Sequence, residues 1–239
     1  MMRLHLLGIS GPFPESRGAT SGYLLEAGES LFQFDLGSGV LGILTSLTAS
    51  EDLSALFVSH WHFDHVADIP VLMYRLQAYQ KKLKVYGPSD PSSPVYALVS
   101  SLPCFSFTEV AAGHSFFMND AEIRVCAARH PVPSVGYRVS FGSKSFGYTG
   151  DTNTLPTLAA DYRNCDLLLA DGLFPTEVWS EEKPHLSAAL AARLAADAGG
   201  GSLVITHLNP LYPRRTLLEE ARAVFSHSKL AESGAVIDL

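Results

Sequence analysis

Short apolar stretches separated by turn residues dominate the first third of the chain. Their lengths and side chains predict three strands, at Leu4–Ile9, Ser21–Glu26 and Ser30–Asp35. Turn signals at Gly11-Pro12 and Ala27-Gly28-Glu29 separate these strands. The following segment, from Val40 to Leu47, carries apolar residues at helical spacing, so we expect a helix there.

The middle of the chain alternates runs of strand length with longer periodic segments. Leu53–Val58 is almost wholly apolar, which predicts a buried strand. Helices are expected at Asp68–Tyr79 and over residues 94–102. Five further strands are predicted, at Leu83–Tyr86, Phe105–Val110, Glu122–Ala128, Val135–Ser140 and Ser145–Tyr148.

The last third mixes the two kinds of element again. The Ala-rich segment Ser187–Ala198 predicts a helix that stops at Gly199-Gly200-Gly201. Other elements are predicted as helices at Asn153–Ala160 and Arg215–Phe225, and as strands at Asp166–Ala170, Leu203–Thr206 and Ala235–Leu239. Because strands and helices are mixed in both halves, we predict an α/β fold of two sheets packed face to face with helices outside.

The composition is that of a globular and rather apolar protein. Of the 239 residues, 47% are hydrophobic and 17% are charged, which excludes general disorder. No linker divides the chain, so we expect one domain over residues 1–239. The apolar start is too short for a signal peptide, and no run approaches a membrane span. The net charge of −7, with scattered basic residues, argues against a broad nucleic-acid surface.

The three cysteines, Cys104, Cys126 and Cys165, are widely separated and lack CxxC spacing. Neither a disulfide framework nor a thiolate metal site is therefore indicated. A reducing cytoplasm is the location that we expect.

The densest chemistry lies in Ser59-His60-Trp61-His62-Phe63-Asp64-His65, directly after the strand at Leu53–Val58. In an extended segment His60 and His62 point to the same side, and Asp64 shares that side if the extension persists. His65 needs a turn to join them, which the helix at Asp68–Tyr79 would supply. Three imidazoles and a carboxylate at this spacing suit two adjacent metal ions better than one. The ligand types favour Zn²⁺, with Mn²⁺ or Fe as alternatives.

Four further polar residues share one setting. Each follows an apolar strand and sits beside Gly, Pro or Thr: His130, Asp151, His185 and His207. Because strand ends meet at a common edge of a sheet, all four could lie together. His5, His114 and His227 have no such context, and we expect them to lie outside the site.

The order of these motifs, HxHxDH, His, TGDT and THL, resembles that of the metallo-β-lactamase superfamily, and within it the tRNase Z-like branch of phosphodiesterases. The resemblance implies an αββα sandwich of two mixed sheets that holds two zinc ions at their shared edge. It implies one metal on His60, His62 and His130, the other on Asp64, His65 and His207, and Asp151 as the bridge between both. It also implies that His185 assists the scissile phosphate or the leaving group, and that Asp35 orients groups of the site.

The resemblance implies a zinc-dependent hydrolase of a small phosphodiester, such as a cyclic nucleotide or a short oligonucleotide. A metal-bridging hydroxide would attack phosphorus, Asp64 would orient it or take its proton, and His185 would assist the departing oxygen. The interval from His130 to Asp151 is too short for the arm with which the family grips tRNA. The alternatives are a lactone or carboxylic ester hydrolase and a non-catalytic metal-binding protein. The expected partner is a small substrate rather than a membrane, and the family resemblance allows a homodimer.

Overall fold

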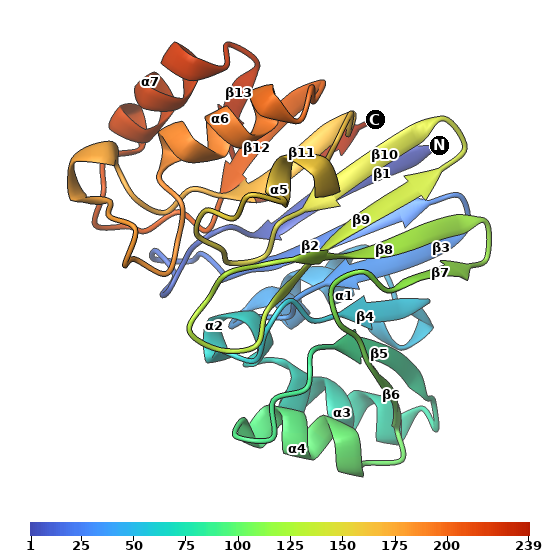
Figure 1. Cartoon of the computed structure of the whole chain (residues 1–239). Coiled ribbons are helices and arrows are strands. Elements are labelled where there is room, and N and C mark those ends of the chain that lie inside the picture. The colour runs from blue at the N-terminus through green and yellow to red at the C-terminus, as the bar shows by residue number, and fades with distance from the viewer.

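The computed structural model describes residues 1–239 as two seven-stranded sheets with helices on both outer faces (Figure 1). The first sheet has the order β14 (Val236–Asp238), β1 (Met2–Gly8), β2 (Gly22–Ala27), β3 (Ser30–Phe34), β4 (Ala55–Phe57), β5 (Leu83–Gly87) and β6 (Phe105–Glu109). The second has the order β13 (Ser228–Leu230), β12 (Ser202–Thr206), β11 (Leu167–Asp171), β10 (Lys144–Tyr148), β9 (Val135–Phe141), β8 (Ala121–Ala127) and β7 (Ser115–Met118).

Both sheets are mixed in the same way. The pairs from β3 to β6 and from β10 to β13 are parallel, whereas the remaining pairs are antiparallel. Parallel neighbours need crossover connections, and these largely contain the helices. The predicted fold class, an αββα sandwich of two mixed sheets, is therefore confirmed.

The helices divide between the two sheets (Figure 1). Those beside the first sheet are α1 (Val40–Leu47), α2 (Phe63–Val66), α3 (Ile69–Ala78) and α4 (Pro94–Ser101), with a 3₁₀ turn at Ser50–Asp52. Those beside the second are α5 (Leu158–Asp161), α6 (Ala188–Asp197) and α7 (Arg214–Val224), with a 3₁₀ turn at Thr176–Val178. None of these helices is both long and apolar enough to cross a bilayer.

The residues of α6 explain its close packing on the second sheet. Its buried face consists largely of alanines, which recur at helical spacing and let the helix approach the strands. At its start, the Ser187 hydroxyl accepts a hydrogen bond from the Leu190 amide. Beyond its end, Gly199 adopts a left-handed conformation with φ of 66°, which ends the helix without the strain of a side chain.

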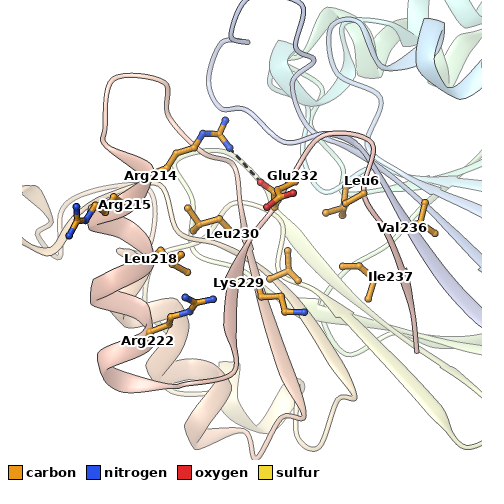
Figure 2. A pocket seen from close by; sticks show the side chains of 13 residues that line it. Leu6, Arg214, Arg215, Leu218, Arg222, Lys229, Leu230, Glu232, Val236 and Ile237 are labelled. Carbon is orange, nitrogen blue, oxygen red and sulfur yellow. Dashed lines mark hydrogen bonds between the residues drawn. The ribbon is translucent and has the colours of Figure 1, made fainter.

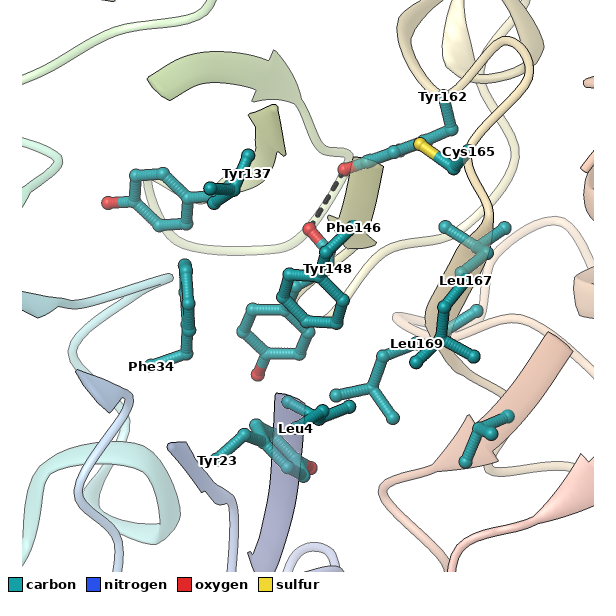
Figure 3. Packing of buried hydrophobic residues seen from close by; sticks show 14 of the residues in the cluster. Leu4, Tyr23, Phe34, Tyr137, Phe146, Tyr148, Tyr162, Cys165, Leu167 and Leu169 are labelled. Atoms are coloured by element: carbon teal, nitrogen blue, oxygen red, sulfur yellow. Dashed lines mark hydrogen bonds between the residues drawn. The ribbon is translucent and has the colours of Figure 1, made fainter. Parts of the chain in front are cut away.

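Aromatic rings fill the space between the two sheets (Figure 3). Phe34 packs against Tyr137, Phe146 and Tyr148, with ring centroids 5.5–6.0 Å apart. Because a buried hydroxyl must keep a hydrogen-bond partner, Tyr137 donates to the Val58 carbonyl over 2.7 Å. The Tyr137 hydroxyl therefore connects the aromatic core to Val58, the residue that directly follows β4.

The structure differs from the predicted elements in several places. The segment Asn153–Ala160 is mostly irregular, because the Asn153 side chain binds the Thr154 amide and the Lys183 carbonyl instead of continuing a helix. Helix forms only at α5, Leu158–Asp161, which overlaps the last three residues of the predicted segment. The strands β7 and β13, which lie at the ends of the second sheet, were not predicted.

Candidate metal centre

The candidate metal ligands gather at one edge of the sandwich, beyond the ends of several strands. The histidine cluster follows β4, whereas the dispersed residues follow β8, β10 and β12, and His185 precedes α6. The structure brings together all eight predicted site residues, namely His60, His62, Asp64, His65, His130, Asp151, His185 and His207. His5, His114 and His227 lie in other hydrogen-bonded settings.

The buried Asp35 carboxylate organises the loop that carries the cluster. Its oxygens accept hydrogen bonds from the Ser59 amide and hydroxyl, each over 2.7 Å. They also accept from Tyr148 Oη over 2.6 Å and face His65 Nδ1 at 2.7 Å. Because Nδ1 of His65 is engaged in this way, Nε2 is the atom left to bind a metal.

The turn that brings His65 into the site comes earlier than predicted. The short helix α2 begins at Phe63, directly within the cluster, rather than at the predicted helix Asp68–Tyr79. The His65 amide accordingly donates to the His62 carbonyl over 2.9 Å. Asp64 therefore lies in a tight turn, and not in the extended segment in which it would share the side of His60 and His62.

The first group of ring nitrogens has the spacing of metal ligands. His62 Nδ1 lies 3.0 Å from His60 Nε2 and 3.1 Å from His130 Nε2. His130 Nδ1 is held by the Pro184 carbonyl at 3.1 Å, which leaves Nε2 as an acceptor. Ligand atoms around a tetrahedral zinc, at about 2.0–2.1 Å from the metal, stand only about 3.3 Å apart. The three nitrogens therefore fit one divalent ion.

A second group lies beside the first. His207 Nε2 is 3.1 Å from an Asp64 oxygen and 3.4 Å from Asp151 Oδ2, and the same Asp151 oxygen lies 3.3 Å from His65 Nε2. This buried nitrogen of His65 has no hydrogen-bond partner, as expected of a metal ligand. Asp151 Oδ2 is also 3.5 Å from His60 Nε2, so one carboxylate faces both groups.

The pKa shifts agree with this arrangement. Burial lowers the pKa of His60 well below its usual value, which keeps the ring neutral and its lone pair available. Burial opposes ionisation of Asp151, but the imidazoles of His207 and His65 outweigh it and hold the pKa of this carboxyl well below its usual range.

Burial also lowers the pKa of His62 and His130, so the first group presents neutral imidazoles. In the second group the carboxylates of Asp151 and Asp64 outweigh burial and raise the pKa of His65 well above its usual value. Imidazole and carboxylate together are the donor set of a divalent metal such as zinc.

Gly11 fits closely over the second group. His207 adopts a left-handed conformation with φ of 56°, and its imidazole lies against the Gly11 backbone. A Cβ atom at Gly11 would lie only 2.1 Å from His207 Nε2. The glycine is therefore needed for the loop after β1 to cover this ligand.

Asp171 is a site residue that the sequence analysis missed. It is fully buried at the end of β11, and its Oδ2 atom lies 2.8 Å from His185 Nδ1. Burial alone would lower the pKa of His185, but the Asp171 and Asp151 carboxylates raise it to about 9. The sequence Ala170-Asp171-Gly172 could have indicated this residue, because Asp171 follows an apolar strand and precedes a glycine. The pair provides an oriented, protonated imidazole next to the candidate metal ligands.

Comparisons with known proteins show the family of this chain. Residues 13–208 match the model of the β-lactamase superfamily domain. A probable metallo-hydrolase of Bacillus subtilis, YhfI, is 29% identical over 98% of this chain and 99% of its own. Ribonuclease Z of Methanosarcina acetivorans is 26% identical over 97% of this chain and 96% of its own.

Solved structures agree as well. The crystal structure of YhfI superposes with a TM-score of 0.93 at 30% identity, over 99% of this chain and 98% of that one. The short form of human tRNase Z superposes with a TM-score of 0.80 at 18% identity, over 99% and 98% of the two chains, which is a likeness of fold alone. The two-sheet fold, the clustered candidate metal ligands and the family match together identify this chain as a metallo-hydrolase of the β-lactamase superfamily.

Proposed function

We propose that the protein is a zinc-dependent phosphodiesterase that hydrolyses a small diester, of the cyclic-nucleotide or short-oligonucleotide type. The observation that carries this proposal is the His185–Asp171 pair beside the shared carboxylate Asp151. A cationic imidazole at this point suits an anionic phosphodiester and its departing oxygen. Relatives that bear the name Ribonuclease Z also support phosphodiester chemistry.

Two zinc ions would be held by the two groups of ligands, with Asp151 between them. When bound, the ions supply Lewis acidity, which activates water and neutralises charge on phosphoryl oxygens. Asp64, whose side chain is partly exposed, would orient the attacking water or take its proton. As the new oxygen–phosphorus bond forms and the bond to the leaving oxygen breaks, His185 would give its Nε2 proton to that oxygen. Asp171 would hold the Nδ1 proton throughout.

An aromatic wall next to His185 supports a substrate that carries a base. The Phe174 ring lies 5.9 Å from the His185 ring and 6.0 Å from Tyr212, measured between centroids. The Lys183 ammonium lies 5.3 Å from the centre of the Phe174 ring. Aromatic faces stack on nucleobases, and a neighbouring cation favours phosphate.

The proposal is tested with the purified holoenzyme on 3′,5′- and 2′,3′-cyclic nucleotides, bis-p-nitrophenyl phosphate and a panel of lactones. We expect turnover of diesters and little of lactones. His185→Gln should lower kcat about 10²-fold to 10⁴-fold with unchanged zinc content, whereas the exposed His227→Gln should change neither. Activity on lactones alone would favour the lactonase alternative, and activity on neither class would favour a non-catalytic metal-binding protein. Loss of zinc in His185→Gln would make His185 a ligand instead.

The reducing cytoplasm stays our proposed location. All three cysteines are buried as free thiols, which supports that environment.

A further inference from the structure

A cavity of about 560 Å³ lies away from the metal centre, where both sheets end (Figure 2). Helix α7 forms one wall, and the end strands β13 and β14 form the others. The residues that define it best are Leu6, Leu218, Arg222, Lys229, Leu230 and Ile237. Its volume falls within the range of about 300–1,000 Å³ that is typical of small-molecule sites.

The floor of this cavity is apolar because α7 and the two end strands place partly covered apolar side chains there. Leu217 and Ala221 of α7 are buried in the core, whereas Leu218 faces the cavity and is only half-buried. Leu230 and Ile237 approach from the strands and are also only partly covered. Their remaining apolar surface can be removed from water only by a bound group.

Four cationic side chains and one carboxylate, Glu232, surround this floor. Because α7 brings residues four apart onto one face, Arg214 and Arg222 flank Leu218 on the cavity side. Arg214 forms an ion pair with Glu15 over 3.0 Å, which leaves it little free charge for a ligand.

Arg222 and Lys229 differ from Arg214, because neither forms an ion pair. Arg222 Nε donates only to the Ser228 carbonyl over 3.1 Å, and Lys229 has no carboxylate within pairing distance. Arg222 and Lys229 outnumber the single carboxylate of the lining, Glu232, in a chain whose net charge is −7. Figure 2 shows both side chains on the same side of the cavity.

We propose that this cavity binds a small amphipathic anion, namely an aliphatic chain that ends in a carboxylate or a phosphate. The chain would cover Leu218, Leu230 and Ile237, and the head group would pair with Arg222 and Lys229. Arginine offers two parallel N–H donors to either head group, and the uncompensated charge favours anions over neutral molecules. The site is separate from the metal centre and does not depend on the reaction catalysed there.

The test is an NMR titration of the ¹⁵N-labelled protein with decanoate, decyl phosphate and uncharged decanol, each below its micellar or solubility limit. We expect saturable shifts at Leu218, Leu230 and Ile237 with the two anions and far weaker ones with decanol. Removing both charges in R222Q/K229Q should weaken binding about tenfold or more, because hydrogen bonds to charged groups are among the stronger ones. The matched control K82Q/K84Q removes two exposed cations elsewhere and should bind like the wild type.

The outcomes separate clearly. Binding of one anion only supports the proposal and identifies the head group. The proposal is overturned by absence of saturable binding, by equal binding of decanol, or by unchanged affinity in R222Q/K229Q with a wild-type melting temperature. Sedimentation equilibrium gives a further check, since a dimer that is lost in Leu218→Gln would assign the cavity to a second copy of the chain instead.

Discussion

The two sheets contribute to the metal centre in different ways. The first sheet supplies four candidate ligands from one loop, His60 to His65, after the single strand β4. The second sheet supplies its residues one at a time, from the separate loops that carry His130, Asp151 and His207. Only the relative positions of the strands bring these together.

The residues that hold the ligands in place also differ between the half of the site on the first sheet and the half on the second sheet. In the first, the single carboxylate of Asp35 fixes Ser59 and His65 and thereby the whole loop. In the second, each residue has its own support, such as the Pro184 carbonyl for His130 and Asp171 for His185. A change in the first half should therefore affect metal binding as a unit, whereas a change in the second should affect one function at a time.

The largest effect is expected for Asp151→Asn, because Asp151 faces both ligand groups. We expect kcat/KM to fall about 10³-fold or more, since charge stabilisation by metals contributes several kcal/mol. Zinc content per chain should fall as well, which elemental analysis and initial rates would measure together. Asp120→Asn, an exposed change in the same sheet, is the control. Full zinc content with normal rates in Asp151→Asn would contradict the proposed role of Asp151 between the two metal ions.

The second largest effect is expected for Asp171→Asn, which removes the charge behind His185. We expect kcat to fall about 10²-fold, within the range of general acid catalysis, with unchanged zinc content. The pKa of His185 is raised to about 9 by Asp171 and Asp151, so loss of the Asp171 charge lowers it. Because the acid must be protonated, the alkaline limb of the kcat profile should move to lower pH. An unmoved limb would mean that His185 is not the titrating acid.

Asp35→Asn should act on the first half as a unit. We expect metal affinity to fall about tenfold, as for other groups that orient ligands, and the free energy of unfolding to fall by about 3 kcal/mol. Asparagine tolerates the φ of 52° at this position, so the change tests the carboxylate rather than the backbone. Chelator competition and urea denaturation would measure both quantities.

The control for this change is Asp166→Asn, a carboxylate that binds the Ser145 amide far from the cluster. It should leave metal affinity unchanged. If Asp35→Asn behaves like this control, the loop from His60 to His65 holds its shape without Asp35.

The same contrast explains what the sequence could predict. The cluster from His60 to His65 is visible because its ligands are contiguous, and the αββα fold follows from the alternation of strands and helices. Asp171 obeys the rule that selected Asp151 and His207, but a lone Asp before Gly is also an ordinary turn residue. Its role depends on the distance to His185, which the register of β10, β11 and β12 sets.

The errors in secondary structure have local causes. The strand β13 has only three residues, of which Lys229 is exposed, and β7 has four in which Phe117 faces solvent. Neither stretch carries enough alternation to stand out. At Asn153 the side chain captures backbone groups from a distant loop, and such tertiary contacts override a helical pattern.

The smallest effect is expected for Tyr148→Phe, which deletes one of the hydrogen bonds to Asp35. Because the other donors to Asp35 stay in place, we expect metal affinity to fall only about threefold and the free energy of unfolding by about 1.5 kcal/mol. Tyr162→Phe deletes an equally buried hydroxyl that donates to the Tyr148 carbonyl instead, and it should lower stability alone. Calorimetry with chelator competition compares the two variants. Equal metal affinity in both would show that Asp35 needs no support from the second sheet.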